Sequence, residues 1–247
     1  MRTRQNHPPV FLKAGGFCYA VGMNRIALRF ALSLALALVP ALVLVGTLGV
    51  GPARADYKGA LQMVRAGDYE KAMAEFLTLA EGGHPQSQFS LGLMHHLGRG
   101  VKPDLKTAYA WYKKSALQEH PPSINNIGMM YLNGEYVAQN REIAFKLFEM
   151  ASAEHAQAKD NLGQCFENGW GVERDIEQAI NFYQLAGEEG YVLGYYHLGR
   201  LFEKGYPDTP KDIDKAVEWY IKAAEKDVAK ARARLIRLKR LPDSLKK

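Results

Sequence analysis

Cysteine is scarce in this chain, which limits the chemistry open to it. The sequence contains only two cysteines, Cys18 and Cys165. Cys18 lies in an N-terminal segment that we expect to be removed, so Cys165 would be the only thiol of the mature chain. One thiol cannot form an internal disulfide framework. Cys165 falls at an apolar position of a predicted helix, and we expect it to be a small buried side chain rather than a nucleophile.

Acidic residues are absent from residues 1–55, which carry six basic residues. Residues 56–247 therefore hold 26 basic and 26 acidic residues, so the formal charge of +6 belongs to the N-terminal segment alone. A high isoelectric point is evidence for nucleic-acid binding only where the excess charge lies on the folded domain. We accordingly expect no nucleic acid among the partners.

Motifs of enzymes and metal sites are also absent from the sequence. It contains no His-Glu-x-x-His, Cys-x-x-Cys or Gly-x-Ser-x-Gly motif and no phosphate-binding glycine loop. His84, His120 and His155 recur at one position of a repeat, which accounts for them without a metal. We therefore expect a protein that is not an enzyme, with no catalytic residues, no metal and no cofactor.

The N-terminal segment has the pattern of a secretory signal peptide. Arg25 and Arg29 precede an uncharged, mostly apolar run over residues 30–52, and Ala53-Arg54-Ala55 follows as an Ala-x-Ala cleavage site. We expect residues 1–55 to be a signal peptide that is cleaved after Ala55.

Export would place the mature chain in the periplasm or outside the cell. Met23 is an alternative start of translation, because residues 1–22 would make an unusually long basic region. The competing interpretation is an uncleaved segment that anchors the protein in the inner membrane, since about 20 apolar residues can span a bilayer.

What the sequence does contain is a repeat of about 36 residues. A glycine follows an apolar residue in four places, with steps of 36, 35 and 36 residues, and a second glycine follows six residues later each time. The first glycines are Gly92, Gly128, Gly163 and Gly199. A small residue and then an aromatic or apolar pair, such as Ala108 and Trp111-Tyr112, follow in the same register. Four such anchors predict a structural repeat.

Each repeat has the pattern of two helices joined by a glycine-containing turn. Apolar residues four apart share one face of the first helix. Asp104, Asn140, Asp175 and Asp212 precede the second helix, where a short oxygen-bearing side chain can cap free amides. We expect the aromatic pair to fill the gap between neighbouring units. One such hairpin cannot bury its own apolar stripe, so the units are expected to stack.

The pattern Leu-Gly-x-x-x-x-x-Gly-x-Gly-Val-x-x-Asp-x-x-x-Ala-x-x-Trp-Tyr-x-x-x-Ala resembles the Sel1-like repeat, a relative of the tetratricopeptide repeat. The second copy departs from it, with Tyr136 for a loop glycine and Asn140 for aspartate. The resemblance implies an all-α fold, a right-handed α-solenoid of antiparallel helix pairs. We expect a capping helix pair at 56–84, repeats at about 85–120, 121–155, 156–191 and 192–227, and a capping helix with a basic tail at 228–247.

The resemblance also implies a function. Sel1-like proteins of this kind act as adaptors in cell-envelope signalling, polysaccharide export and motility assemblies, so we expect an exported scaffold or regulator that binds a peptide or protein partner of the cell envelope in its concave groove. A membrane-tethered assembly factor is one alternative. A cell-wall hydrolase or β-lactam-binding protein is another, although the cysteine pairs of such relatives are absent here.

Amide and aromatic side chains around the repeat glycines are the candidate groove residues, because amides can donate to and accept from a peptide backbone. They are Asn125, Asn126, Met129, Asn133, Gln157, Asn161, Gln164, Asn168, Tyr196, His197 and Arg200. The alternative is that these asparagines are simply tolerated at exposed positions. The basic tail, nine basic and two acidic residues over 226–247, suggests peripheral membrane contact or else a solvated capping helix. Nothing in the sequence sets the oligomeric state.

Overall fold

The computed structural model describes residues 56–246. The expectations about the signal peptide, the start at Met23 and the membrane anchor concern residues outside this range. The described chain forms eleven α-helices and one short 3-10 helix, and no strand occurs within it. In chain order they are α2 (Tyr57–Ala66), α3 (Tyr69–Glu81), α4 (Pro85–Leu97), α5 (Leu105–Ala116), α6 (Pro121–Asn133), α7 (Arg141–Ser152), α8 (Ala156–Asn168), α9 (Ile176–Glu188), α10 (Leu193–Lys204), α11 (Ile213–Ala224), α12 (Ala229–Arg237) and η1 (Asp243–Leu245).

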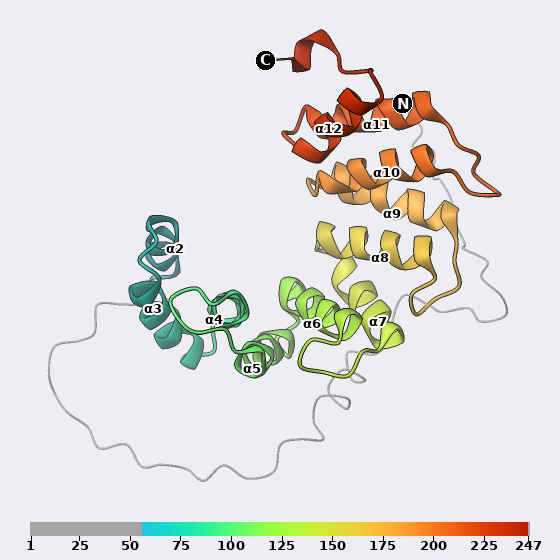
Figure 1. Ribbon diagram of the computed structural model, residues 1–247. Coiled ribbons are helices and arrows are strands. Elements are labelled where there is room, and N and C mark those ends of the chain that lie inside the picture. Colours follow the sequence, from blue (N-terminus) through green and yellow to red (C-terminus); the bar gives the residue numbers. More distant parts are fainter. Residues whose placement is uncertain (1–55, 247) are drawn as a thin grey trace, which may run out of the picture. The chain divides into compact units, whose positions relative to one another are not determined.

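The helices pack in the order in which they follow one another along the chain. Each of the four repeat pairs, from α4 with α5 to α10 with α11, packs most closely within itself and then against the next element, while α3 packs about equally against α2 and α4, and α12 packs on α11. Figure 1 shows this stepwise stacking. The prediction of an all-α helical-repeat fold is confirmed. None of the helices in residues 56–246 is both long and apolar enough to cross a membrane.

The predicted caps hold the start of the second helix of each repeat. Asp104 accepts hydrogen bonds from the backbone amides of Lys106 and Thr107 at 3.0 and 3.1 Å. The side chains of Asn140, Asp175 and Asp212 each accept from the backbone amide three residues on. Such a cap stabilises a helix by about 1 kcal/mol. The prediction of these four caps is confirmed.

An aromatic ring packs directly against the repeat glycine, where a side chain would leave no room for it. A Cβ at Gly163 would lie 2.6 Å from the Tyr183 ring, and one at Gly128 would lie 2.7 Å from Phe148. The same contact joins Gly92 to Tyr112 and Gly199 to Tyr220. The second member of each aromatic pair therefore packs inside its own helix hairpin. The expectation that both members fill the gap between units has to be corrected, because only a glycine leaves room for a ring this close to the first helix.

The turn of the third repeat also depends on a further glycine, two residues after the second one. Gly171 has a φ of 74°, and a Cβ there would overlap the backbone carbonyl of Arg141 in the preceding unit. Tyr136 takes the corresponding place in the second repeat with a φ of 62°, which is costly for a residue with a Cβ. Its ring lies beside Tyr109, at 5.4 Å between centroids. The departure from the pattern changes the loop surface and leaves the helix pairing intact.

Cys165 is buried in α8, as predicted from its place in the repeat. Burial raises the pKa of its thiol to about 12. The thiolate form, which is the reactive one, is therefore suppressed at physiological pH.

Candidate functional site

The first helices of the four repeats, α4, α6, α8 and α10, present the surface that we call the helix-A face. Its centre is set by two positions, one and five residues after the repeat glycine, which lie on the same side of a helix. The eight residues are Leu93 and Leu97, Met129 and Asn133, Gln164 and Asn168, and Arg200 and Lys204. All eight are at least partly exposed to solvent.

The predicted groove residues divide into an accessible and a buried group. Asn126, Met129, Asn133, Gln157, Gln164, Asn168, Tyr196, His197 and Arg200 all retain some exposed surface. By contrast, Asn125 has none and Asn161 is only 6% exposed. The expectation that these two amides line an open groove has to be corrected. For the other nine residues, partner binding stays a prediction.

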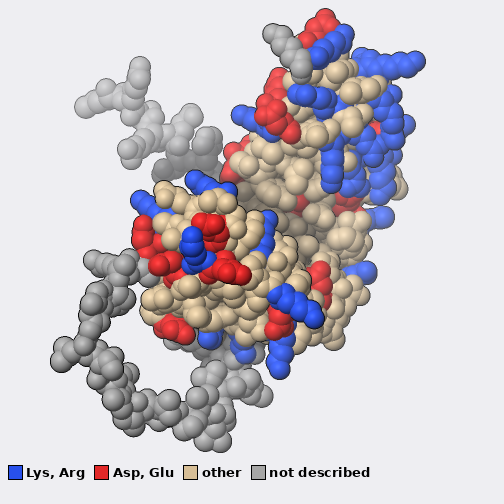
Figure 2. Space-filling view, turned by 60° about the vertical axis from the view of Figure 1, so that its left-hand side comes forward, with Lys and Arg blue, Asp and Glu red and all other residues tan. Residues whose placement is uncertain are grey.

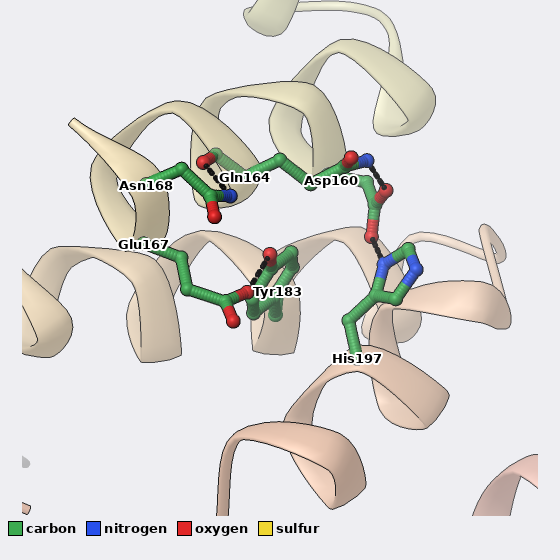
Figure 3. A network of polar contacts seen from close by, with 6 residues as sticks. All are labelled: Asp160, Gln164, Glu167, Asn168, Tyr183 and His197. Carbon is green, nitrogen blue, oxygen red and sulfur yellow. Dashed lines mark hydrogen bonds and ion pairs between the residues drawn. The ribbon is translucent and has the colours of Figure 1, made fainter. Parts of the chain in front are cut away.

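The buried side chains of Asn125 and Asn161 bond to each other across a repeat boundary. The Nδ2 of Asn161 in α8 donates to the Oδ1 of Asn125 in α6 at 2.7 Å. One repeat later, Asp160 stands at the position of Asn125 and His197 at that of Asn161. They are also in contact, with His197 Nδ1 in α10 lying 2.7 Å from Asp160 Oδ1 in α8. Figure 3 shows the His197 contact. These side chains hold successive first helices together.

The carboxylate of Asp160 is buried, with only 1% of the residue exposed. Besides the His197 contact, its second oxygen accepts from Gln164 Nε2 at 2.9 Å. A buried carboxylate needs such partners because desolvation without them is costly. Burial raises the pKa of the neighbouring Tyr191, and the charge of Asp160 raises it further. This network is a structural joint between α8 and α10.

A second set of polar contacts ties the buried tyrosines to the first helices. The hydroxyl of Tyr183 donates to Glu167 Oε2 at 2.6 Å, and Tyr206 from the next repeat donates to Glu167 Oε1 at 2.7 Å. Tyr220 donates to Glu203 at 2.6 Å. Burial and the adjacent carboxylate raise the pKa of Tyr183 above its ordinary range, so the hydroxyl keeps its proton.

The other two repeats vary this arrangement in a consistent way. In the first repeat, the Tyr112 hydroxyl lies 3.4 Å from His96 Nδ1, and His96 Nε2 lies 3.3 Å from Glu135 of the next repeat. In the second repeat the ring is Phe148, which has no hydroxyl, and the place of His96 and Glu167 is taken by the apolar Leu132. These pairs were not predicted from the sequence. A signal for them was present, because the repeats with a buried tyrosine have His or Glu at the partner position, whereas the repeat with Phe148 has Leu132 there.

Positive charge gathers toward the C-terminal end of the described chain. Figure 2 shows Lys and Arg side chains concentrated in the upper part of the molecule, where Figure 1 places α10 to α12. Arg234 and Arg237 of α12 pair with Glu203, at 3.3 and 2.7 Å, and Arg240 pairs with Asp214 at 3.3 Å. Part of the basic tail is thus used to fasten α12 to the last repeat.

The polar contacts described so far are hydrogen bonds and ion pairs within the repeat array. His96 and His197 are paired with carboxylates across repeats, and the one described thiol is buried with a raised pKa. Within residues 56–246 no three His, Cys, Asp or Glu side chains are grouped so as to hold a metal ion. The centre of the helix-A face is exposed to solvent and is therefore accessible to a ligand.

Comparison with known proteins agrees with this architecture. The model of the Sel1 repeat matches residues 85–120, 121–154, 156–191 and 192–228. The structure is similar to the crystal structure of a Sel1 repeat protein from Oxalobacter formigenes, with 32% identity and a TM-score of 0.66 over 73% of this chain and 74% of that one.

Two curated relatives are similar in sequence. Chitin synthase regulatory factor 3 of Schizosaccharomyces pombe is 28% identical over 172 residues, which is 66% of this chain and 18% of that protein. The putative sel1-like repeat-containing protein R815 of Acanthamoeba polyphaga mimivirus is 32% identical over 80 residues, 32% of this chain and 15% of that protein. This chain thus spans less than a fifth of either relative. With four matching repeats and the same helical stacking, the chain belongs to the Sel1 repeat family.

Proposed function

We propose that this protein is an exported, non-enzymatic scaffold or regulator that binds a peptide or protein partner on its helix-A face. The Sel1 repeat is a unit of protein-interaction scaffolds, which supports the general class. The observation that carries the proposal is that the first helices use different residues for joining the repeats and for the solvent-exposed surface. Residues such as Asn161 and His197 are used to join the repeats, whereas the central residues are exposed and differ in chemistry from one repeat to the next.

The compartment that we propose is the periplasm or cell exterior, on the basis of the signal-peptide pattern in residues 1–55. The yeast relative is named a regulatory factor, and a regulator that acts by binding needs no catalytic residues. A membrane-tethered assembly factor remains the alternative if the N-terminal segment is retained, with the basic tail as a peripheral membrane contact.

The test combines mass spectrometry of the natively exported protein with crosslinking and capture of its partner. We expect a mature N-terminus at Asp56 and a specific envelope protein in the crosslinked complex. Asn168→Arg on the helix-A face should reduce that complex strongly. Asn181→Arg, an equal change at an exposed site on the second helix of the same repeat, should leave it unchanged.

Three results would count against the proposal. Equal capture by both variants would place the binding surface elsewhere. A retained N-terminal segment, with release of the protein only by detergent, would favour the tethered factor. Turnover of nitrocefin or peptidoglycan by the purified protein would favour a hydrolase.

A further inference from the structure

The centre of the helix-A face changes from apolar to cationic along the chain. The two central positions carry Leu93 and Leu97 in the first repeat and Arg200 and Lys204 in the fourth. Between them lie amides, represented by Asn133 and Gln164 in the second and third repeats. Because equivalent residues of stacked repeats follow one another in space, the change forms a gradient along one surface.

The apolar end is open rather than part of the core. Leu97 is 50% exposed. Neither Leu93 nor Leu97 is among the side chains packed in the core clusters of the described chain, whereas Phe89, on the same helix, is packed beside Tyr112 with 5.9 Å between ring centroids. Leu97, and to a smaller extent the partly exposed Leu93 one helical turn earlier, thus offer apolar surface to solvent.

The cationic end has no acidic partner of its own. Within residues 56–246, neither Arg200 nor Lys204 forms a salt bridge. The nearby carboxylates are already engaged, Glu167 by two tyrosine hydroxyls and Glu203 by Tyr220 and the α12 arginines. The Nζ of Lys204 donates to the Tyr206 hydroxyl at 2.6 Å and lies 4.3 Å from the centre of the same ring, so its contacts in the described chain are with an uncharged residue. Its positive charge is therefore not neutralised within the described chain.

The amides between these ends can still bond a polypeptide backbone. Asn133, Gln164 and Asn168 each donate one hydrogen bond within the chain, to Glu135, Asp160 and the Gln164 carbonyl, which leaves each with a second N–H and an acceptor oxygen. We propose, on the basis of the binding function proposed above, that the helix-A face binds an extended peptide segment that is apolar at one end and acidic at the other. The apolar end lies on Leu93 and Leu97, and the acidic end pairs with Arg200 and Lys204. Separation of the two chemistries along the face fixes the direction in which the segment binds, because a reversed segment would place carboxylates on leucine.

Fluorescence anisotropy with synthetic peptides tests this inference on the natively exported protein. Three labelled peptides share one composition. Two contain a leucine-rich block, a glutamine and serine spacer and an aspartate-rich block, in either order along the chain, and the third interleaves the same residues. We expect at least one of the two block peptides to bind about tenfold more tightly than the interleaved peptide, since a peptide with separate blocks can contact both ends of the face at once and the interleaved peptide cannot.

Two variants separate the ends. Arg200→Glu with Lys204→Glu should weaken binding of the preferred peptide by about tenfold or more, because two attractive charges become repulsive. Leu93→Ser with Leu97→Ser should weaken it while leaving its salt dependence unchanged. Lys106→Glu with Lys146→Glu is the matched control, because it makes the same change in net charge at exposed lysines of the second helices.

The inference is overturned if the interleaved peptide binds as tightly as both block peptides, or if the control variant weakens binding as much as the Arg200 and Lys204 variant. Failure of every peptide to bind would also overturn it. The proposed function has a separate readout. If Asn168→Arg still abolishes capture of the natural partner, the helix-A face is a binding surface for a segment of different chemistry.

Discussion

The contact between Tyr183 and Glu167 allows a quantitative test of how the repeats are held together. The Tyr183 ring is fully buried and its hydroxyl donates to Glu167 at 2.6 Å. A hydrogen bond to a charged group contributes about 1.5–3 kcal/mol. Tyr183→Phe should therefore lower the free energy of unfolding by about this amount, with Glu167 still accepting from Tyr206. Glu167→Leu should cost about 2 kcal/mol or more, because it leaves the buried Tyr183 hydroxyl without a partner.

The double variant decides whether the pair acts as a unit. Tyr183→Phe with Glu167→Leu recreates the combination of Phe148 and Leu132 that the second repeat contains. We expect its loss of stability to be smaller than the sum of the single losses by about 1–2 kcal/mol, which is a typical coupling for residues in contact. The reciprocal change, Phe148→Tyr with Leu132→Glu, should likewise cost less than its two single substitutions added together.

The assay is equilibrium unfolding in urea, followed by far-ultraviolet circular dichroism and by tyrosine and tryptophan fluorescence. Two probes are needed because a repeat array can lose one end before the rest. If the single losses add up in the double variant, the hydrogen bond contributes nothing beyond packing and the reasoning is wrong. If Tyr183→Phe alone lowers the free energy of unfolding by less than about 0.5 kcal/mol, the strength assigned to this hydrogen bond is wrong.

Three further predictions concern other parts of the repeats. Gly163→Ala should destabilise the protein by about 1–3 kcal/mol by displacing the Tyr183 ring, whereas Gly59→Ala, where a Cβ would meet its nearest neighbour at 3.5 Å, should stabilise it slightly in thermal unfolding. Although burial acts in the opposite direction, hydrogen bonds from Tyr220 and Arg237 hold the pKa of Glu203 below its ordinary value of 4.5. Its contribution is thus present above pH 4.5 and is lost as the pH falls below that, so hydrogen exchange in α12 should accelerate there and Glu203→Gln should remove the dependence. Cys165 should not react with a thiol reagent at pH 8 until the protein is unfolded, given its buried thiol with a pKa of about 12.

The pairing of helices was predictable because the residues that determine it recur at the same position of each repeat. A residue such as Gly163 occurs at the same place in four successive units, and an oxygen-bearing cap such as Asp175 stands before each second helix. These features act locally, through room for a ring and through unpaired amides. Local causes leave a pattern that can be read along the chain, which explains why the helix pairs and their caps were predicted correctly.

The fate of the asparagines was not predictable in the same way. Asn126 and Asn161 occupy equivalent places in consecutive repeats, yet Asn126 keeps exposed surface and Asn161 is buried. The difference depends on the preceding repeat, which offers Asn125 as a partner to Asn161, while Phe89 stands in that place before Asn126. An amide beside another amide forms a bond across the boundary, and one beside an aromatic ring does not. Equivalence within a repeat therefore says little about the contact between repeats.

The contacts between repeats also argue that their order is specified. His96 meets Glu135 of the following repeat, and Glu167 meets Tyr206 of the following repeat. In the second repeat, the position of His96 and Glu167 is occupied by Leu132. In the third repeat, the position of Glu135 and Tyr206 is occupied by Trp170. Leu132 and Trp170 both pack in the apolar cluster around Phe148. If the third repeat followed the first, the carboxyl partner of His96 would be replaced by an indole. Each boundary thus favours its own neighbour, because a mismatch would leave a polar group without a partner.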